Sequence, residues 1–169
     1  DSNFNNDGNR GERIMEYLWL KYIHIISSTF LFGTGVGSAF YMFRANLTKD
    51  PHSIYFAARN VVLADWLFTT PAIIIQPVTG VMMMYIAGYS LTDFWIITSF
   101  ALYFLAGMCW LPVVYIQMRM RDMAKQAVET QSELPPFYWK LERIWFWLGV
   151  IAFPALIAVF YLMVFKPLF

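Results

Sequence analysis

Four apolar segments dominate the sequence, and each is long enough to cross a lipid bilayer. They run over about residues 17–43, 61–87, 94–117 and 144–165. A helix of about 20 apolar residues spans the hydrocarbon layer, and lipid offers no water to an unpaired backbone, so spans of this length are helices. The sequence therefore predicts an all-α membrane protein, with a single antiparallel four-helix transmembrane bundle over residues 15–169.

The composition agrees with a membrane protein and excludes one class of partner. Hydrophobic residues make up 59% of the chain and charged residues only 14%, with a mean hydropathy of +0.51. A soluble domain carries about 25% charged residues. The net charge of +1 provides no electrostatic reason to bind nucleic acid. The partner that the composition predicts is the lipid bilayer.

The ends and connections of the spans carry most of the charge. Residues 1–14 are polar and rich in Asn and Gly, which predicts a disordered or non-native leader. Residues 44–60 read as a polar loop, 88–93 as a tight hairpin, and 118–143 as a helical extension that breaks at Pro135 and Pro136. The first and third of these connections hold 8 of the 12 Lys and Arg residues. The positive-inside rule then places them in the cytoplasm and both termini outside.

The first span contains two ionisable residues, Lys21 and His24. Lys21 is close enough to the outer interface to reach it with its amine. His24 lies three residues deeper, about 4.5 Å along a helix, and an ionisable group inside a membrane is a candidate functional site. Neutral imidazole is a good ligand for heme iron. We therefore favour His24 as the iron ligand of a heme b; a contact to a proton or quinone, or a structural hydrogen bond to Gln76 or Tyr103, stays open as an alternative.

Helical periodicity groups other residues with this histidine. At 100° per residue, the face of His24 continues through Ser28, Leu31, Gly35, Ser38 and Met42, most of which are small. The predicted cofactor site comprises His24, Ser28, Gly35, Gln76, Met83 and Tyr103. Met83 is a weaker candidate for a second iron ligand, and copper bound by His24 and outer methionines is weaker still. Gly33 and Gly37 form a GxxxG motif on the opposite face, where a second helix could pack closely.

The second span carries a polar stripe that two prolines interrupt. Asp65, Thr69, Gln76 and Thr79 share one face, and Pro71 and Pro77 lie within the same span. Proline frees a carbonyl in the preceding turn, which a neighbour must satisfy in lipid. The stripe is therefore either polar packing for a kinked helix or the wall of a ligand site. We expect Asp65 to pair with an arginine such as Arg44 or Arg119, with a role in proton relay as the alternative.

Longer stretches of the chain resemble a known family. WLKYIHIISSTFLFGTGVGSAFYMFRA, FTTPAIIIQPVTGVMMM, FWIITSFALYFLAGMCWLPVVYIQMRMRDMA and FWLGVIAFPALIAVFYLMVFKP resemble the bacterial four-helix "predicted integral membrane protein" family of unknown function. The resemblance covers nearly the whole chain from Met15. It implies a multi-pass protein of the bacterial inner (cytoplasmic) membrane.

The same stretches are similar to HemJ, the membrane protoporphyrinogen oxidase, and more loosely to CopD-like copper-resistance proteins. The HemJ similarity lies in Trp19-Leu20-Lys21…His24, in Arg44, and in Thr70-Pro71-Ala72…Gly80. HemJ-type proteins bind heme b through the histidine of the first helix, which implies His24 as an axial ligand here. They also carry a lysine early in the third helix, where FWIITSFALYF has none and Ser99 or a neighbour takes its place.

Two principal functions remain after this reading. One is a heme b protein near the outer face that oxidises a porphyrin precursor or passes electrons to a quinone, as a HemJ-like oxidoreductase. The other is a non-enzymatic accessory subunit that docks onto a larger membrane complex or onto its own copies. A small metal-handling protein is a third reading. No nucleophile–base pair, phosphate loop or HExxH motif occurs in the sequence, which disfavours hydrolases and nucleotide enzymes.

Overall fold

The computed structural model describes the backbone of residues 2–167 and the side chains of residues 10–167, and in this part of the chain every regular element is helical. The elements are α1 (Ser2–Thr48), α2 (Pro51–Ala64), the π-helix η1 (Asp65–Thr69), α3 (Thr70–Ala87), α4 (Phe94–Glu129) and α5 (Pro136–Phe165). Because α2, η1 and α3 follow one another without a break, they form one long helical rod. Each of the four resulting rods is long and apolar enough to cross a membrane, which confirms the predicted fold class.

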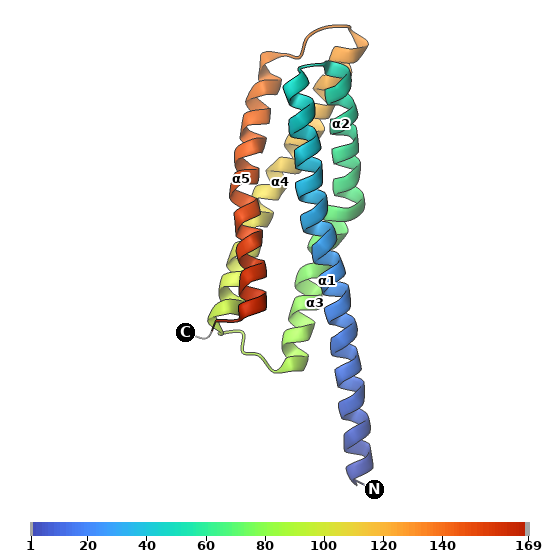
Figure 1. The fold of residues 1–169 in the computed structure, drawn as a ribbon, viewed down its shortest axis with the longest axis vertical. Helices are drawn as coiled ribbons and strands as arrows, with labels where there is room; N and C mark the ends of the chain where they lie inside the picture. The colour runs from blue at the N-terminus through green and yellow to red at the C-terminus, as the bar shows by residue number, and fades with distance from the viewer. Residues whose placement is uncertain (1, 168–169) are drawn as a thin grey trace.

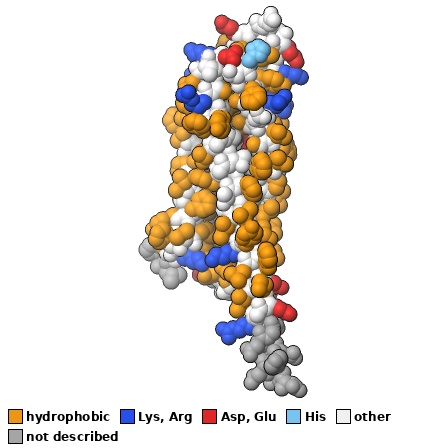
Figure 2. Space-filling view, turned by 45° about the vertical axis from the view of Figure 1, so that its right-hand side comes forward, with side chains coloured by type: hydrophobic (Ala, Val, Ile, Leu, Met, Phe, Trp, Pro, Cys, Tyr) orange, Lys and Arg blue, Asp and Glu red, His pale blue; other side chains and the backbone are white. Residues whose placement is uncertain are grey.

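The four rods run alternately up and down (Figure 1). The short turn between α1 and α2 and the loop between α4 and α5 lie at one end, and both ends of the chain lie at the other. Hydrophobic side chains cover the length of the bundle, and Lys and Arg side chains gather near its two ends (Figure 2). Assignment of the terminal end to the outside of the cell rests on the Lys and Arg count and stays a prediction.

Two segments differ from the expected boundaries. Residues 2–14, expected to be disordered, continue α1 as a helix. Residues 51–60, expected to be a polar loop, form most of α2. This helix begins at Pro51 because Asp50 caps it: the Asp50 carboxylate accepts hydrogen bonds from the backbone N–H and the hydroxyl of Ser53, at 2.9 and 2.6 Å. These bonds also hold the pKa of Asp50 below its ordinary value.

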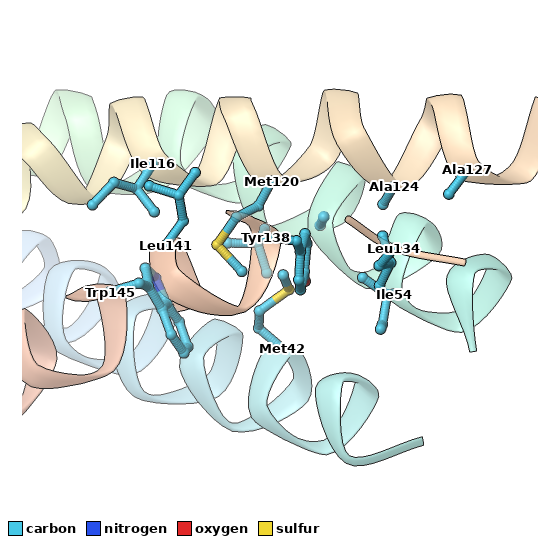
Figure 3. Packing of buried hydrophobic residues seen from close by; sticks show 12 residues of the cluster. Met42, Ile54, Ile116, Met120, Ala124, Ala127, Leu134, Tyr138, Leu141 and Trp145 are labelled. Atoms are coloured by element: carbon cyan, nitrogen blue, oxygen red, sulfur yellow. The ribbon is translucent and has the colours of Figure 1, made fainter. Parts of the chain in front are cut away.

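The main hydrophobic core lies at the end of the bundle away from the termini. Its members come from α1, α2, α4, the α4–α5 loop and α5 and include Met42, Ile54, Met120, Tyr138 and Trp145 (Figure 3). Ile54 of α2 is fully buried in this core. Its packing holds the start of α2 against the bundle, although the neighbouring residues in the sequence are polar. The Tyr138 hydroxyl donates to Asn46 Oδ1 at 2.7 Å and ties α5 to α1. The opposite half of the bundle has a smaller core and holds a large cavity.

Pro71 and Pro77 interrupt the backbone hydrogen bonds of the second rod, and the structure around them differs. The π-helix η1 ends at Thr69, two residues before Pro71, and its wider turn lets the backbone N–H and the hydroxyl of Thr70 donate to the Asp65 carbonyl. Pro77 has no N–H for the carbonyl of Ile73, four residues earlier. The Tyr103 hydroxyl of α4 donates to that carbonyl instead, at 2.6 Å.

Candidate functional site

Two cavities lie between the helices, and Tyr103 lines both of them. The first, called the His24 cavity, has a volume of about 440 Å³ and lies toward the terminal end. Its walls come from all four rods and include Tyr17, Lys21, His24, Gln76, Gly80, Met83, Trp95, Ser99, Tyr103, Met163 and Lys166. The second, called the Asp65 cavity, has a volume of about 490 Å³ and is lined by Asp65 and many apolar residues of α1, α3, α4 and α5.

The hydrogen bonds of His24 determine which ring nitrogen is free. Its Nδ1 lies 2.8 Å from the Thr79 hydroxyl oxygen, and that hydroxyl lies 2.7 Å from the carbonyl of Ile75. Donation of the single Thr79 hydroxyl proton to this carbonyl, the shorter of its two carbonyl contacts, assigns the tautomer of the ring. The Thr79 oxygen must then accept from Nδ1–H of His24. In the neutral ring this leaves the lone pair on Nε2, which has no hydrogen-bond partner among the described residues.

Two further hydrogen bonds hold α1 against α3 at this level. The Gln76 side-chain amide donates to the backbone carbonyl of His24 at 2.7 Å. One turn further along α1, the buried Ser27 hydroxyl donates to the carbonyl of Ala72 at 3.3 Å. Together with the His24–Thr79 bond they fix the position of the imidazole from both its backbone and its ring. Such outer partners are what orients a ligating histidine in metal sites.

Gly80 leaves space beside the imidazole. A Cβ built on Gly80 would lie 3.5 Å from His24 Cε1, and no other atom would come within 4 Å. Any longer side chain at this position would therefore lie against the ring and extend toward the His24 cavity. The glycine keeps one side of the histidine accessible.

Two lysines line the His24 cavity near the terminal end. Lys21 of α1 is exposed, and Lys166, at the end of α5, donates from Nζ to the Tyr89 hydroxyl at 2.8 Å. The Lys166 ammonium also lies 4.7 Å from the centre of the Tyr89 ring and 5.5 Å from that of Trp95. The cavity thus combines apolar walls with one imidazole and two positive charges.

The structure brings together only part of the predicted site. His24, Gln76, Met83 and Tyr103 all line the His24 cavity. Gly35 instead lines the Asp65 cavity, where a Cβ built on it would lie 3.3 Å from the Phe153 ring. Ser28 lines neither cavity, and its hydroxyl donates back to the carbonyl of Ile25. The expected face of α1 does turn inward, but its members meet different neighbours at different depths.

Asp65 is bonded differently from the expected pairing with an arginine. Its side chain is buried, and the Thr69 hydroxyl donates to Oδ1 at 2.9 Å. In the amide orientation that satisfies both of its ends, Gln117 donates to Asp65 Oδ2 at 2.6 Å and accepts from Trp145 Nε1 at 3.2 Å. Among the described residues, the ion pairs join Arg121 to Asp122 and Lys125 to Glu129 instead. Polar donors of α4 and η1 therefore replace the cation that the sequence suggested.

The two glycines of the GxxxG motif of α1 have open space beside them in the described part of the chain. A Cβ built on Gly33 or Gly37 would meet no atom within 4 Å among the described residues. The expectation that a second helix approaches here is therefore not met within the monomer. The motif faces outward, toward lipid or another protein.

Sequence reasoning missed several residues of the His24 cavity. Lys166, Tyr89 and Trp95 line it but lie far from His24 in the sequence. The one signal that the three share is their position near the end of a predicted span. An antiparallel bundle brings these span ends to the same end of the molecule as the start of the first span. Ser99 also lines this cavity.

The donor set limits which metals the site could hold. Among the described residues, no three His, Cys, Asp or Glu side chains come close enough to hold a metal ion. A protein-built copper or zinc site needs several such ligands. Heme brings four nitrogen ligands of its own and requires only one or two from the protein. The residues around His24 therefore fit a heme better than a bare ion.

Comparison with known proteins identifies the family of the chain. The chain belongs to the family described as predicted integral membrane protein (DUF2269), whose model matches residues 18–167. No curated protein and no solved structure shows significant similarity to it. The chain is therefore a multi-pass integral membrane protein with four candidate spans.

Proposed function

We propose that this DUF2269 protein binds heme b in the His24 cavity, with His24 Nε2 as an axial ligand, and serves a redox role in the membrane. The observation that carries the proposal is the hydrogen bonding of the ring. Thr79 holds Nδ1–H, so the lone pair of Nε2 is left without a partner in a cavity built by all four rods. This is the tautomer that an iron-ligating histidine requires.

The volume and the chemistry of the cavity support the proposal. About 440 Å³ lies within the range of sites that hold small molecules and cofactors. Apolar side chains form most of the walls, as a macrocycle buried in a membrane protein requires. Lys21 and Lys166 would pair with the two carboxylates that heme carries, and the end of the bundle that holds them is close to water. Heme, when bound, supplies one-electron chemistry, while the protein sets ligand, burial and access.

The resemblance to HemJ supports the same ligand. By that resemblance His24 takes the place of the first-helix histidine that binds heme b in HemJ-type proteins. Ser99, which the resemblance puts at or beside the place of the HemJ lysine, lines the cavity. A serine there provides no iron ligand as strong as an amine, so the second axial position would be filled by Met83 or stay open. A porphyrin precursor or a quinone is the proposed redox partner, and a bacterial inner membrane the proposed location.

Absorption spectroscopy tests this proposal. The protein is produced with heme supplied, purified in detergent, and measured oxidised and dithionite-reduced beside His24→Ala and His52→Ala. His52 is the matched control because it is the only other histidine and is exposed at the far end of the bundle. We expect a Soret band and sharp reduced bands in the wild type and in His52→Ala, but not in His24→Ala. A colourless wild type, or a His24→Ala protein with an unchanged spectrum, would overturn the proposal.

The outward GxxxG motif favours a second candidate, an accessory subunit. Small residues let two membrane helices approach closely, and a Cβ built on Gly33 or Gly37 would meet no atom within 4 Å in the described part of the chain. This reading predicts that the protein co-purifies with larger subunits or its own copies, and that Gly33→Leu with Gly37→Leu abolishes the association. An association that persists in the double variant would remove the motif from consideration.

A further inference from the structure

We propose that Lys166 selects the ligand of the His24 cavity by binding one of its carboxylates, so that the cavity takes tetrapyrroles with free carboxylates and discriminates against their neutral esters. The proposal rests on heme binding at His24 and adds the feature of the ligand that the same cavity recognises. It gives the two lysines of the cavity unequal roles: Lys166 is a fixed anion-binding group, whereas Lys21 contributes little to affinity.

The Lys166 ammonium is held in one place by two aromatic side chains. Its Nζ donates a hydrogen bond to the Tyr89 hydroxyl at 2.8 Å, and it lies 4.7 Å from the centre of the Tyr89 ring and 5.5 Å from that of Trp95. The negative face of an aromatic ring attracts a cation within about 6 Å. An ammonium has three N–H donors, so the bond to Tyr89 leaves two for a ligand.

The two rings are themselves fixed by packing. They meet edge to face, with centroids 5.3 Å apart and planes at 89°. Trp95 is 4% exposed and belongs to the smaller core with Met84 and Leu162. Tyr89 directly follows the turn that ends α3, and its backbone N–H donates to the Met84 carbonyl at 3.1 Å. The end of α3, the start of α4 and the end of α5, which lie at the same end of the bundle (Figure 1), therefore build one floor beneath the ammonium.

The backbone of Lys166 also departs from the helix. The residue ends α5 in the left-handed region, at φ 42° and ψ 56°, and its N–H donates to the Leu162 carbonyl at 2.9 Å. L side chains rarely adopt this conformation, and it persists only where surrounding contacts hold it. Tyr89 and Trp95 provide such contacts, so the lysine is positioned before any ligand binds. A group positioned in this way loses less conformational entropy on binding than a free one.

No carboxylate compensates the charge of Lys166 in the part of the chain that the structure describes. The ion pairs found there join Arg121 to Asp122 and Lys125 to Glu129. Lys166 is half-buried beside mainly apolar walls, where a hydrogen bond to an anion is stronger than in water. The cavity therefore favours a ligand with an apolar body and an anionic edge. A fatty acid meets this requirement but leaves the lone pair of His24 Nε2 unused, whereas a heme with free carboxylates uses both.

Lys21 provides the matched control, because nothing holds its ammonium. It lines the same cavity from α1, is exposed, and takes part in no hydrogen bond or ion pair among the described residues. Exposed ion pairs contribute little, since water and the entropy of a long side chain both oppose them. Removing Lys21 should therefore cost much less affinity than removing Lys166.

Titration with two related compounds tests the selection. Ferric heme and its dimethyl ester are each added to the full chain in detergent, and the dissociation constant is taken from the Soret difference spectrum. Lys166→Met should weaken the binding of heme about tenfold, through the loss of one charge-assisted hydrogen bond, and should leave the binding of the ester unchanged. Lys21→Met should weaken heme binding less than about threefold, and Lys166→Arg should retain most of the affinity.

The ratio of the two dissociation constants separates recognition from structural damage. A substitution that merely disturbs the fold weakens both compounds equally and leaves the ratio at its wild-type value, and that result in Lys166→Met would overturn the proposal. Partition into micelles affects each compound equally in every variant, so it cancels when the ratios are compared. Equal effects of Lys166→Met and Lys21→Met would also overturn selection by Lys166, while leaving heme binding through His24 intact. A wild type that binds neither compound would overturn both proposals.

Discussion

Tyr103→Phe should destabilise the bundle only as long as Pro77 is present. The Tyr103 hydroxyl donates at 2.6 Å to the Ile73 carbonyl, which would otherwise bond the N–H of residue 77. Proline has no such N–H. Removing the hydroxyl therefore leaves a carbonyl within the span without a partner. In Pro77→Ala, the alanine N–H can bond Ile73 within the helix, and the hydroxyl of Tyr103 becomes dispensable.

The size of the effect follows from the environment of this bond. A buried polar group left unpaired costs about 1–3 kcal/mol. Hydrogen bonds between membrane helices average about 0.6 kcal/mol and reach about 1.7 kcal/mol. Because the Tyr103–Ile73 bond is short and its acceptor has no alternative in the helix, we expect a loss of about 1–2 kcal/mol in the wild type. In the Pro77→Ala background we expect less than about 0.5 kcal/mol.

The four proteins of this double-mutant cycle are unfolded in mixed micelles with a rising mole fraction of sodium dodecyl sulfate. Circular dichroism reports the unfolded fraction. Tyr161→Phe is the matched control, because Tyr161 is 56% exposed and its hydroxyl makes no hydrogen bond among the described residues. Equal losses from Tyr103→Phe in both backgrounds would refute the assignment of this hydroxyl as the substitute for the missing proline N–H.

Three further substitutions test how the site and the fold are held. Thr79→Val should lower heme affinity about 10- to 100-fold in a titration, because His24 loses the partner that fixes its ring, whereas Thr29→Val on the lipid-facing side of α1 should not. Gly80→Leu should reduce bound heme, with no loss of helical circular dichroism, since its side chain extends beside the ring of His24. Asp50→Ala should lower the melting temperature at neutral pH by removing the cap of α2. Because folding lowers the pKa of Asp50, its contribution is present above about pH 4 and is lost as the pH falls through the folded value, so the wild type and Asp50→Ala should converge in acid.

The helical spans could be predicted from the sequence because an apolar segment that is long enough to cross the bilayer must be a helix in lipid. The start of α2 could not be predicted in the same way. Its polar residues at positions 49–53 indicated a loop, yet they form a turn and a cap, and Ile54 and Ala58 bury their side chains four residues apart. Short helices at the membrane surface depend on what packs against them, which hydropathy does not record.

Only part of the candidate site could be predicted from the sequence, and the reason is geometric. Helical periodicity correctly placed His24 and Gly35 on one side of α1. It gives no information on which neighbours a residue meets at its level along the helix axis. Eleven residues separate them, about 16 Å along the helix, and so they line different cavities. The bonding of Asp65 was also beyond reach of the sequence, because Gln117 and Trp145 come from two later helices. Pairings across a bundle depend on rotation of each helix about its axis, which a single sequence does not fix.

Chemical rescue of the histidine tests the central claim most directly. In His24→Gly the ring is replaced by space in the His24 cavity, and free imidazole added to the purified, heme-supplied protein can occupy that space and ligate the iron. We predict that the variant lacks the wild-type reduced spectrum and regains it with rising imidazole, whereas imidazole leaves the wild-type spectrum unchanged. A His24→Gly protein that shows the wild-type spectrum without imidazole would contradict the assignment of His24 as the heme ligand.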